Sequence, residues 1–306
     1  MKVLEGDYRT WTPLDEPTAV TIGVYDGVHL GHQQVLRSLA DTGLPVVVAT
    51  FRDHPVGTIA PAEAPGLLTD IDRRLDILAE MGVSATAVID FNEEFRNLTA
   101  EAFVEELLVA TLRARWVAVG RGFRFGHRQL GDVALLRALG ELHDFTVGDI
   151  AIVEEGVPVR STVIRALLRE GHAAAAHRLL GRPHRLQATV VPGDQRGRHI
   201  GFPTANVETA PGLIVPGSGV YAAYALVEGV RHAAVVNIGT RPTFGGTESV
   251  VEAHLLDFAG DLYGRELALD FIVRLRSERK FSGVEELVAA ISNDVQSARH
   301  VLEGLV

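Results

Sequence analysis

The sequence predicts an α/β domain with a parallel sheet, followed by an antiparallel β-barrel with one helix packed on it. Two observations lead to this fold class. Strands and helices alternate over the first half of the chain, whereas short strands follow one another without helices over most of the second. The length of 306 residues, 47% of them hydrophobic, also suits two domains better than one.

In the first half, short runs rich in β-branched residues alternate with helical stretches. The predicted strands cover residues 18–25, 45–51, 84–90, 115–120 and 145–153. Their largely unbroken apolar character is typical of parallel strands covered on both faces. Because ligands of such sheets bind beyond the carboxyl ends of the strands, we expect a site formed by the motifs after Tyr25, Phe51 and Gly120.

The alternation stops at Arg182-Pro183, so the boundary is predicted there, between domains 1–182 and 183–306. Beyond it, Gly- and Pro-bearing turns separate strand-like runs at 186–193, 219–229, 231–239, 249–257 and 266–276. Consecutive strands of this kind indicate an antiparallel barrel. The last segment is an amphipathic helix that begins near Gly283, with Val284, Leu287, Val288 and Ile291 on its expected core face.

Composition excludes several classes of protein and site. A formal net charge of −10 argues against a nucleic-acid partner, and the absence of Cys excludes disulfides and thiolate metal sites. No stretch has the apolar length of a signal or a membrane span, so we expect a cytoplasmic protein without a membrane partner. Lys2 and Lys280 are the only lysines and neither follows a Gly-rich loop, which excludes a P-loop kinase. The lack of a Lys-bearing second motif and of a basic surface argues against an aminoacyl-tRNA-synthetase-like protein.

Residues 23–32, GVYDGVHLGH, leave a predicted strand and enter a helix. His29 and His32 are three residues apart, so both imidazoles can face one space, at which free N–H groups and the positive end of the helix dipole also point. We therefore expect a nucleotide-phosphate site, with the small and acidic residues of the motif around it: Gly23, Asp26, Gly27 and Gly31. Two unrelated surface histidines near a turn are the alternative.

Two further motifs are candidates for the same site. In 160–165, RSTVIR, the hydroxyls of Ser161 and Thr162 either bind phosphate or cap the helix that they open. Arg165, one turn later, either clamps a triphosphate or forms a surface salt bridge. The motifs after Phe51 and Gly120 contain three further candidate binding residues, His54, Phe123 and Phe125, of which His54 and Phe125 could equally be packed core.

The second domain carries a longer motif at 193–206, GDQRGRHIGFPTAN. Its glycines, Gly193, Gly197 and Gly201, let the backbone close on phosphate oxygens where a Cβ would clash. Thr204 and Asn206 are two apart in extended chain and present oxygens to one side, which suits Mg²⁺ shared with ATP phosphates. A turn with Asx hydrogen bonding is the alternative for these residues.

From about Val20 to Leu302 the chain resembles the prokaryotic bifunctional riboflavin kinase and FAD synthetase family, on these motifs and on those at 50–55, 120–126, 237–244, 251–257 and 260–264. The resemblance implies a Rossmann-like nucleotidylyltransferase domain in which His29 and His32 stabilise charge on ATP as FMN attacks it. In the same domain it implies that His54, Phe123 and Phe125 contact the flavin. It also implies a six-stranded riboflavin kinase barrel. There Thr204 and Asn206 bind Mg²⁺, Asn237 contacts flavin, and Glu252 accepts the proton of the attacking hydroxyl.

The expected function is therefore phosphorylation of riboflavin to FMN with ATP and Mg²⁺ in the C-terminal domain, and adenylylation of FMN to FAD with release of pyrophosphate in the N-terminal domain. Two alternatives stay open. In the first, the N-terminal domain has an altered specificity or is inactive, because three of its motif residues depart from the family's usual ones: Asp53, Gly122 and Arg160. In the other, the chain is a non-catalytic flavin sensor and Glu252 an ordinary solvent-facing strand residue. The sequence predicts no oligomeric state.

Overall fold

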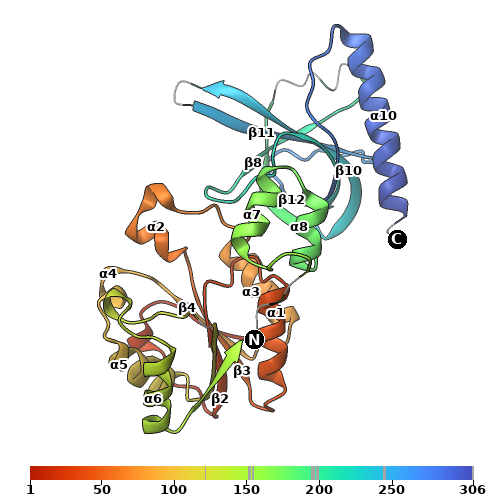
Figure 1. Ribbon diagram of the computed structural model, residues 1–306. Coiled ribbons are helices and arrows are strands. Elements are labelled where there is room, and N and C mark those ends of the chain that lie inside the picture. The colour runs from red at the N-terminus through yellow and green to blue at the C-terminus, as the bar shows by residue number, and fades with distance from the viewer. Residues whose placement is uncertain are drawn as a thin grey trace. The chain divides into compact units, whose positions relative to one another are not determined.

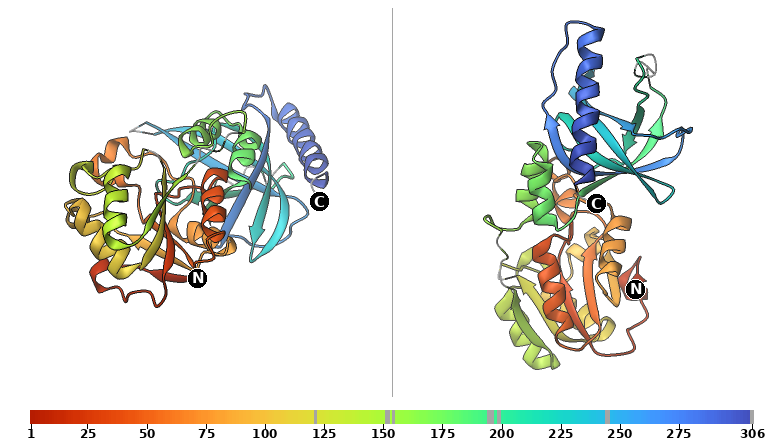
Figure 2. Two further views of the ribbon diagram at one scale, coloured as in Figure 1. Left: turned by 60° about the horizontal axis from the view of Figure 1, so that its bottom comes forward. Right: turned by 90° about the vertical axis from the view of Figure 1, so that its right-hand side faces the viewer.

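The computed structural model describes residues 1–120, 122–150, 153, 155–193, 197, 200–243 and 246–304. The motif residues Arg121, 194–196, 198–199 and Phe244 lie outside this described part. By its internal contacts the chain divides into two compact units, Met1–Arg160 and Ser161–Val306 (Figures 1 and 2).

This division falls before the boundary expected after Arg182. The two intervening helices, α7 (Ser161–Arg169) and α8 (Ala173–Leu180), pack on each other, and α8 also contacts strands of the barrel. Those contacts group both helices with the second unit.

The first unit contains a six-stranded parallel sheet in the order β1-β4-β3-β2-β5-β6, which confirms the predicted α/β class. The strands are β1 (Lys2–Leu4), β2 (Thr18–Ile22), β3 (Val46–Phe51), β4 (Ala85–Ile89), β5 (Ala114–Gly120) and β6 (Thr146–Ile150). Sequence reasoning missed β1, because three residues in a charged segment show no periodicity.

Helices cover both faces of this sheet. Successive strand residues point to opposite faces, so neighbouring residues of one strand belong to different cores. Val20 and Val47 belong to one core cluster with Leu107, whereas Ala19 and Val48 belong to another. The helical segments of the unit are α1 (Leu30–Ala40), α2 (Pro55–Ile59), α3 (Ile71–Glu80), α4 (Glu93–Arg96), α5 (Ala100–Ala102), a π-helical segment (Phe103–Thr111) and α6 (Val133–His143), with short 3₁₀ turns at Tyr8–Thr10, Pro61–Glu63 and His127–Gln129.

Strand order reverses next to β2, which pairs with β3 on one side and with β5 on the other. Such a reversal opens a crevice beyond the carboxyl ends of the strands, where ligands of open α/β sheets bind. The chain leaves β2 at Gly23 and enters α1 at Leu30, so the predicted histidine motif lies at this point.

The second unit contains a closed antiparallel barrel in the order β10-β11-β8-β7-β12-β9, as expected. Its strands are β7 (His184–Val191), β8 (Ala205–Thr209), β9 (Gly219–Val227), β10 (Val230–Thr243), β11 (Gly246–Leu255) and β12 (Glu266–Arg276). The pattern of runs had indicated five strands. The sixth, β8, is formed by the end of the PTAN motif and the residues after it.

Helix α10 (Val284–Glu303) packs on the outside of the barrel against β9, β10 and β12 (Figure 1). The expected core face of α10 is wrong. Val284 is 62% exposed, and the buried residues of the helix are Ala290, Asp294, Ala298 and Leu302. Leu287 and Ile291 instead line a cavity, so the apolar side chains of the first turns do not enter the core. Within the described residues no helix is both long and apolar enough to cross a membrane.

We predict that Phe271→Ala destabilises the barrel by about 3–5 kcal/mol, because the side chain is fully buried and its removal leaves a cavity. The ring packs edge-on against Tyr221, with 5.3 Å between centroids. Urea unfolding followed by far-UV circular dichroism measures the change. Val230→Ala is the control, since Val230 is 57% exposed and its truncation is expected to cost no more than about 0.5 kcal/mol. Equal effects of the two substitutions would contradict the packing described here.

Candidate functional site

The loop after β2 is fastened to the end of β3. The Gly23 N–H donates to the Ala49 carbonyl at 3.1 Å, and the Thr50 hydroxyl donates to the Val24 carbonyl at 2.8 Å. Tyr25 adopts a left-handed conformation with φ of 52°, which is costly for a bulky residue. The contacts on both sides hold the chain in this turn as it approaches α1.

His29 is the N-cap residue of α1. Its Nδ1 accepts the backbone N–H of His32 at 3.3 Å, so in the neutral ring the proton lies on Nε2, which becomes a donor. The rings of His29 and His32 stack with 3.7 Å between centroids. A Cβ on Gly31 would lie only 3.1 Å from the His29 ring, so glycine gives that ring its space. The structure thus brings the two predicted histidines together.

Tyr25 extends this ring stack. Its ring lies 4.5 Å from that of His32 between centroids, and its hydroxyl is 2.7 Å from the Thr21 hydroxyl. The side chain is buried, and burial raises the pKa of Tyr25, so the phenol is neutral. Sequence reasoning did not single out Tyr25. An aromatic residue inside the turn before the two histidines was the available signal.

Asp26 and Gly27 tie the same loop to residues 68–69. The Asp26 carboxylate is 1% exposed and accepts the backbone N–H groups of Leu68 at 2.8 Å and Thr69 at 3.1 Å. The Gly27 N–H donates to the Thr69 hydroxyl at 3.2 Å. These bonds direct the Asp26 carboxylate toward the protein, and its contact with nucleotide stays a prediction.

Arg74 of α3 lies fully buried beneath this arrangement. Its guanidinium donates to the Phe51 carbonyl at 2.6 Å and to the Thr69 carbonyl at 3.4 Å, which joins the end of β3 to the segment held by Asp26. Desolvation lowers the pKa of Arg74, and the negative charge of Asp26 acts against that shift. No sequence pattern singles out Arg74, since an arginine within an amphipathic helix ordinarily faces water.

The predicted flavin contacts of the first unit differ in their surroundings. His54 caps α2, with Nδ1 accepting the Val56 N–H at 3.3 Å, and is half-buried. Phe125 is buried and packs against Phe103 and Phe123 at centroid distances of 5.4 and 5.5 Å, so its side chain belongs to the core. Phe123 lies at the edge of that core and is half-buried.

Ser161, Thr162 and Arg165 lie on the first turns of α7, which is grouped with the second unit. Ser161 is the first helical residue, Thr162 is exposed and Arg165 is buried, so the alternative of a surface salt bridge for Arg165 is wrong. Their roles at the nucleotide stay predictions.

The three positions that depart from the family pattern are all exposed: Asp53, Gly122 and Arg160. A Cβ at Gly122 would meet no other atom within 4 Å, so packing does not require glycine at this position.

In the barrel, one row of cross-strand partners builds the second site. Glu252 of β11 is paired with Asn237 of β10 on one side and with Asn206 of β8 on the other. The row continues through Val220 of β9 to Arg276 of β12. All five residues line one cavity of about 370 Å³ between the barrel and α10. The structure therefore places Glu252 in a cavity, rather than on an ordinary solvent-facing strand.

Gly193 and Gly197 of the glycine-rich motif lie close to the predicted metal ligands. A Cβ on Gly193 would come within 2.0 Å of the Asn206 amide nitrogen, and one on Gly197 within 2.3 Å of the Phe202 carbonyl oxygen and 3.3 Å of the Thr204 hydroxyl. Glycine is thus required at both positions, because each backbone lies too close to neighbouring protein atoms to leave room for a Cβ. Gly201 has a φ of 87°, a conformation that favours glycine.

A second cavity, of about 550 Å³, adjoins the first at Thr204, which lines both. Its wall includes the predicted motif residues Gly260, Asp261, Leu262 and Tyr263. Thr204 and Asn206 offer neutral oxygen ligands, which fit a hard cation that takes its remaining ligands from phosphates. Among the described residues, no group of three or more His, Asp or Glu is arranged to hold a metal by itself.

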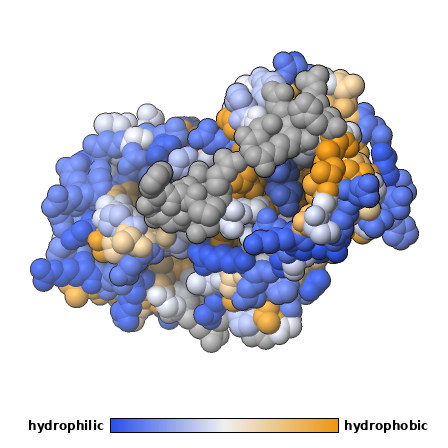
Figure 3. Space-filling view, turned by 90° about the horizontal axis from the view of Figure 1, so that it is seen from above, coloured by the Kyte–Doolittle hydropathy of each residue, from blue (hydrophilic) through white to orange (hydrophobic). Residues whose placement is uncertain are grey.

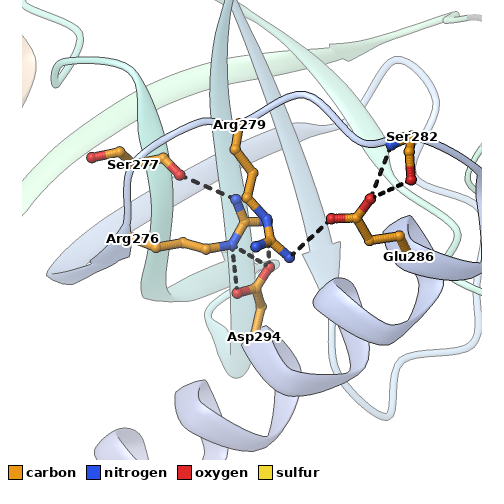
Figure 4. Close-up of polar contacts among 6 residues, drawn as sticks. All are labelled: Arg276, Ser277, Arg279, Ser282, Glu286 and Asp294. Atoms are coloured by element: carbon orange, nitrogen blue, oxygen red, sulfur yellow. Dashed lines mark hydrogen bonds and ion pairs between the residues drawn. The ribbon is translucent and has the colours of Figure 1, made fainter.

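One wall of the 370 Å³ cavity is held by ion pairs to α10 from the end of β12 and from the segment that follows it (Figure 4). Arg276 pairs with both oxygens of Asp294, at 2.7 Å for the shortest contact, and Arg279 lies 4.0 Å from Glu286. Both arginines also lie over the ring of Phe281, at 5.6 and 4.8 Å from its centroid. Phe281 itself also lines this cavity.

Apolar side chains complete the cavity: Val220, Val235, Phe281, Leu287 and Ile291. Figure 3 shows apolar surface (orange) on the right-hand side of the view, bordered by hydrophilic residues (blue). An apolar chamber with a few convergent polar groups is suited to a flat, partly polar ligand.

Comparison with known proteins assigns both units. Residues 12–163 match the family model of FAD synthetase and residues 180–302 match that of riboflavin kinase. The bifunctional riboflavin kinase/FMN adenylyltransferase of Escherichia coli (strain K12) is 40% identical over 305 residues, covering 98% of this chain and 97% of that protein. That of Bacillus subtilis (strain 168) is 34% identical, covering 92% and 91%.

A crystal structure described as a macrolide-efflux protein from Streptococcus pneumoniae is also similar, with a TM-score of 0.90 and 28% identity over 98% of this chain and 99% of that one. The family models and the curated relatives agree with each other over both units. The chain therefore belongs to the family of bifunctional riboflavin kinase/FMN adenylyltransferases, with an N-terminal FAD synthetase domain and a C-terminal riboflavin kinase domain.

Proposed function

We propose that this chain converts riboflavin and ATP to FMN in the barrel, and FMN and ATP to FAD in the N-terminal unit, each with Mg²⁺. The observation that carries the kinase proposal is the row in which Glu252 lies between Asn206 and Asn237, next to the junction of two cavities at Thr204. A binding-only module has no chemical need for a carboxylate placed beside metal ligands at such a junction.

In the kinase reaction, ATP occupies the 550 Å³ cavity and riboflavin the 370 Å³ cavity, so that the γ-phosphate and the 5′-hydroxyl meet near Thr204. Glu252 accepts the hydroxyl proton as the oxygen attacks the γ-phosphorus and ADP leaves. Thr204 and Asn206 would hold the metal ion, which would offset the negative charge of the phosphates. The apolar wall with Phe281 and Leu287 receives the flavin ring.

In the adenylyl transfer, a phosphate oxygen of FMN attacks the α-phosphorus of ATP and pyrophosphate leaves. The Nε2–H of His29 and the N–H groups at the start of α1 stabilise negative charge on the phosphates. His32 is held parallel to His29 by its two ring contacts. The site works by position and charge, with no covalent intermediate on the enzyme.

We expect Glu252→Gln to lower FMN formation at least about 100-fold, since the amide cannot accept the proton, while adenylylation of supplied FMN is unchanged. Chromatographic separation of riboflavin, FMN and FAD measures both reactions on one preparation. Near-normal FMN formation by this variant would remove Glu252 from the mechanism.

The reciprocal variant is His32→Phe, which keeps a ring against Tyr25 but lacks the imidazole nitrogens. FAD formation from FMN is expected to fall about 100- to 1,000-fold, with riboflavin phosphorylation unchanged. If His32→Phe instead reduced both activities equally, the assignment of the two reactions to separate units would be wrong.

Asp26→Asn tests the support of the adenylyl site. The amide places a donor against backbone N–H groups and removes a charge that faces buried Arg74, so we expect a loss of about 1–3 kcal/mol in unfolding free energy and a lower rate of FAD formation. Asp41→Asn, at the exposed end of α1, is the control and is expected to change stability by less than about 0.5 kcal/mol. Unaltered stability of Asp26→Asn in urea unfolding would show that the loop does not depend on these bonds.

A further inference from the structure

His254 joins the strand of the proposed base to the segment of the proposed metal ligands. It lies two residues after Glu252 on β11 and lines the same cavity. Its Nδ1 is 2.7 Å from the carbonyl oxygen of Pro203, the residue before Thr204. Because a carbonyl oxygen can only accept, Nδ1 carries the proton and donates it. The ring also meets Phe202 edge-on, at 5.7 Å between centroids.

The strand register shows why a side chain is needed at this place. The described ladder between β8 and β11 ends at the pair Ala205 and Ala253. Pro203 lies beyond that end and, as a proline, has no backbone N–H with which to extend the ladder. The His254 bond to the Pro203 carbonyl therefore continues the attachment of this segment to β11 past the last backbone pair, and Thr204 lies between the two points of attachment.

We infer that His254 is a positioning residue for the phosphoryl-transfer site. By holding Pro203, it keeps the Thr204 hydroxyl on the same side as the Asn206 amide and near Glu252. It acts through the backbone of the metal-binding segment and does not itself transfer the substrate proton. This inference rests on the proposed kinase function, and it adds a residue that neither composition nor spacing had singled out.

Three substitutions separate positioning from chemistry. His254→Asn places an amide N–H near the position of Nδ1 and can still donate to Pro203, whereas His254→Gln carries its amide one carbon further out. His254→Phe keeps the ring against Phe202 without any donor. We expect the Asn variant to stay within about 3-fold of wild type, and the Gln and Phe variants to raise KM for Mg²⁺-ATP and lose about 10- to 100-fold in kcat/KM, as displaced reacting groups do.

A binding measurement gives a readout that does not need turnover. ADP is titrated calorimetrically into each protein with and without Mg²⁺. We expect the Gln and Phe variants to lose about 10-fold of the Mg²⁺-dependent affinity while binding metal-free ADP like wild type, since only the placement of the metal ligands is disturbed. Far-UV circular dichroism and FAD formation from supplied FMN show that each variant is folded.

The outcomes distinguish the inference from the function on which it rests. If the Asn variant loses as much as the Gln variant, the ring itself takes part in the chemistry and positioning is wrong. If all three variants bind Mg²⁺-ADP and turn over like wild type, the Pro203 bond has no role. Failure of the wild-type protein to phosphorylate riboflavin would instead overturn the proposed function, and the calorimetric comparison would still decide the role of His254.

Discussion

The register of the closed barrel is the constraint on which the kinase site depends. Val251 and Ala253 are buried in the barrel core, so Glu252 between them must face outward, where it is paired with Asn206 and Asn237. A slip of one residue in β11 would turn the carboxylate into the core and bring two apolar side chains out. The apolar burial of its neighbours thus fixes the direction of the Glu252 side chain, the proposed base, and the closed ladder leaves this strand no free edge along which to shift.

In the N-terminal unit, polar contacts rather than strand register hold the site residues in position. Its histidines lie in a loop and the first turn of a helix, which have no ladder to hold them. Asp26, Gly27 and buried Arg74 supply that support by tying the loop to neighbouring segments. His29 adds to this support, because its ring both caps α1 and stacks on the ring of His32. Loop contacts of this kind make the geometry of the site sensitive to residues that touch no substrate.

Patterns local in sequence predicted most of the fold and led to the proposed site residues. Strand-helix alternation indicated the parallel sheet, and the spacing of the histidine and PTAN motifs pointed to the proposed site residues His29, His32, Thr204 and Asn206. Contacts between distant segments escaped prediction: Arg74 is buried only because β3 and residues 68–69 surround it, and His254 acts through a residue 51 positions away. The buried face of α10 was predicted wrongly because some of its apolar residues line a cavity, and the periodicity of a sequence does not distinguish a cavity wall from a packed core.

The most direct test of two successive reactions in one chain is a time course with riboflavin, excess ATP and Mg²⁺, in which the three flavins are separated by chromatography. Two sites in one chain predict that FMN appears first and then declines as FAD accumulates, with pyrophosphate formed in step with FAD. FMN that accumulates without FAD would contradict the adenylyl-transfer site, and unchanged riboflavin would contradict the kinase site.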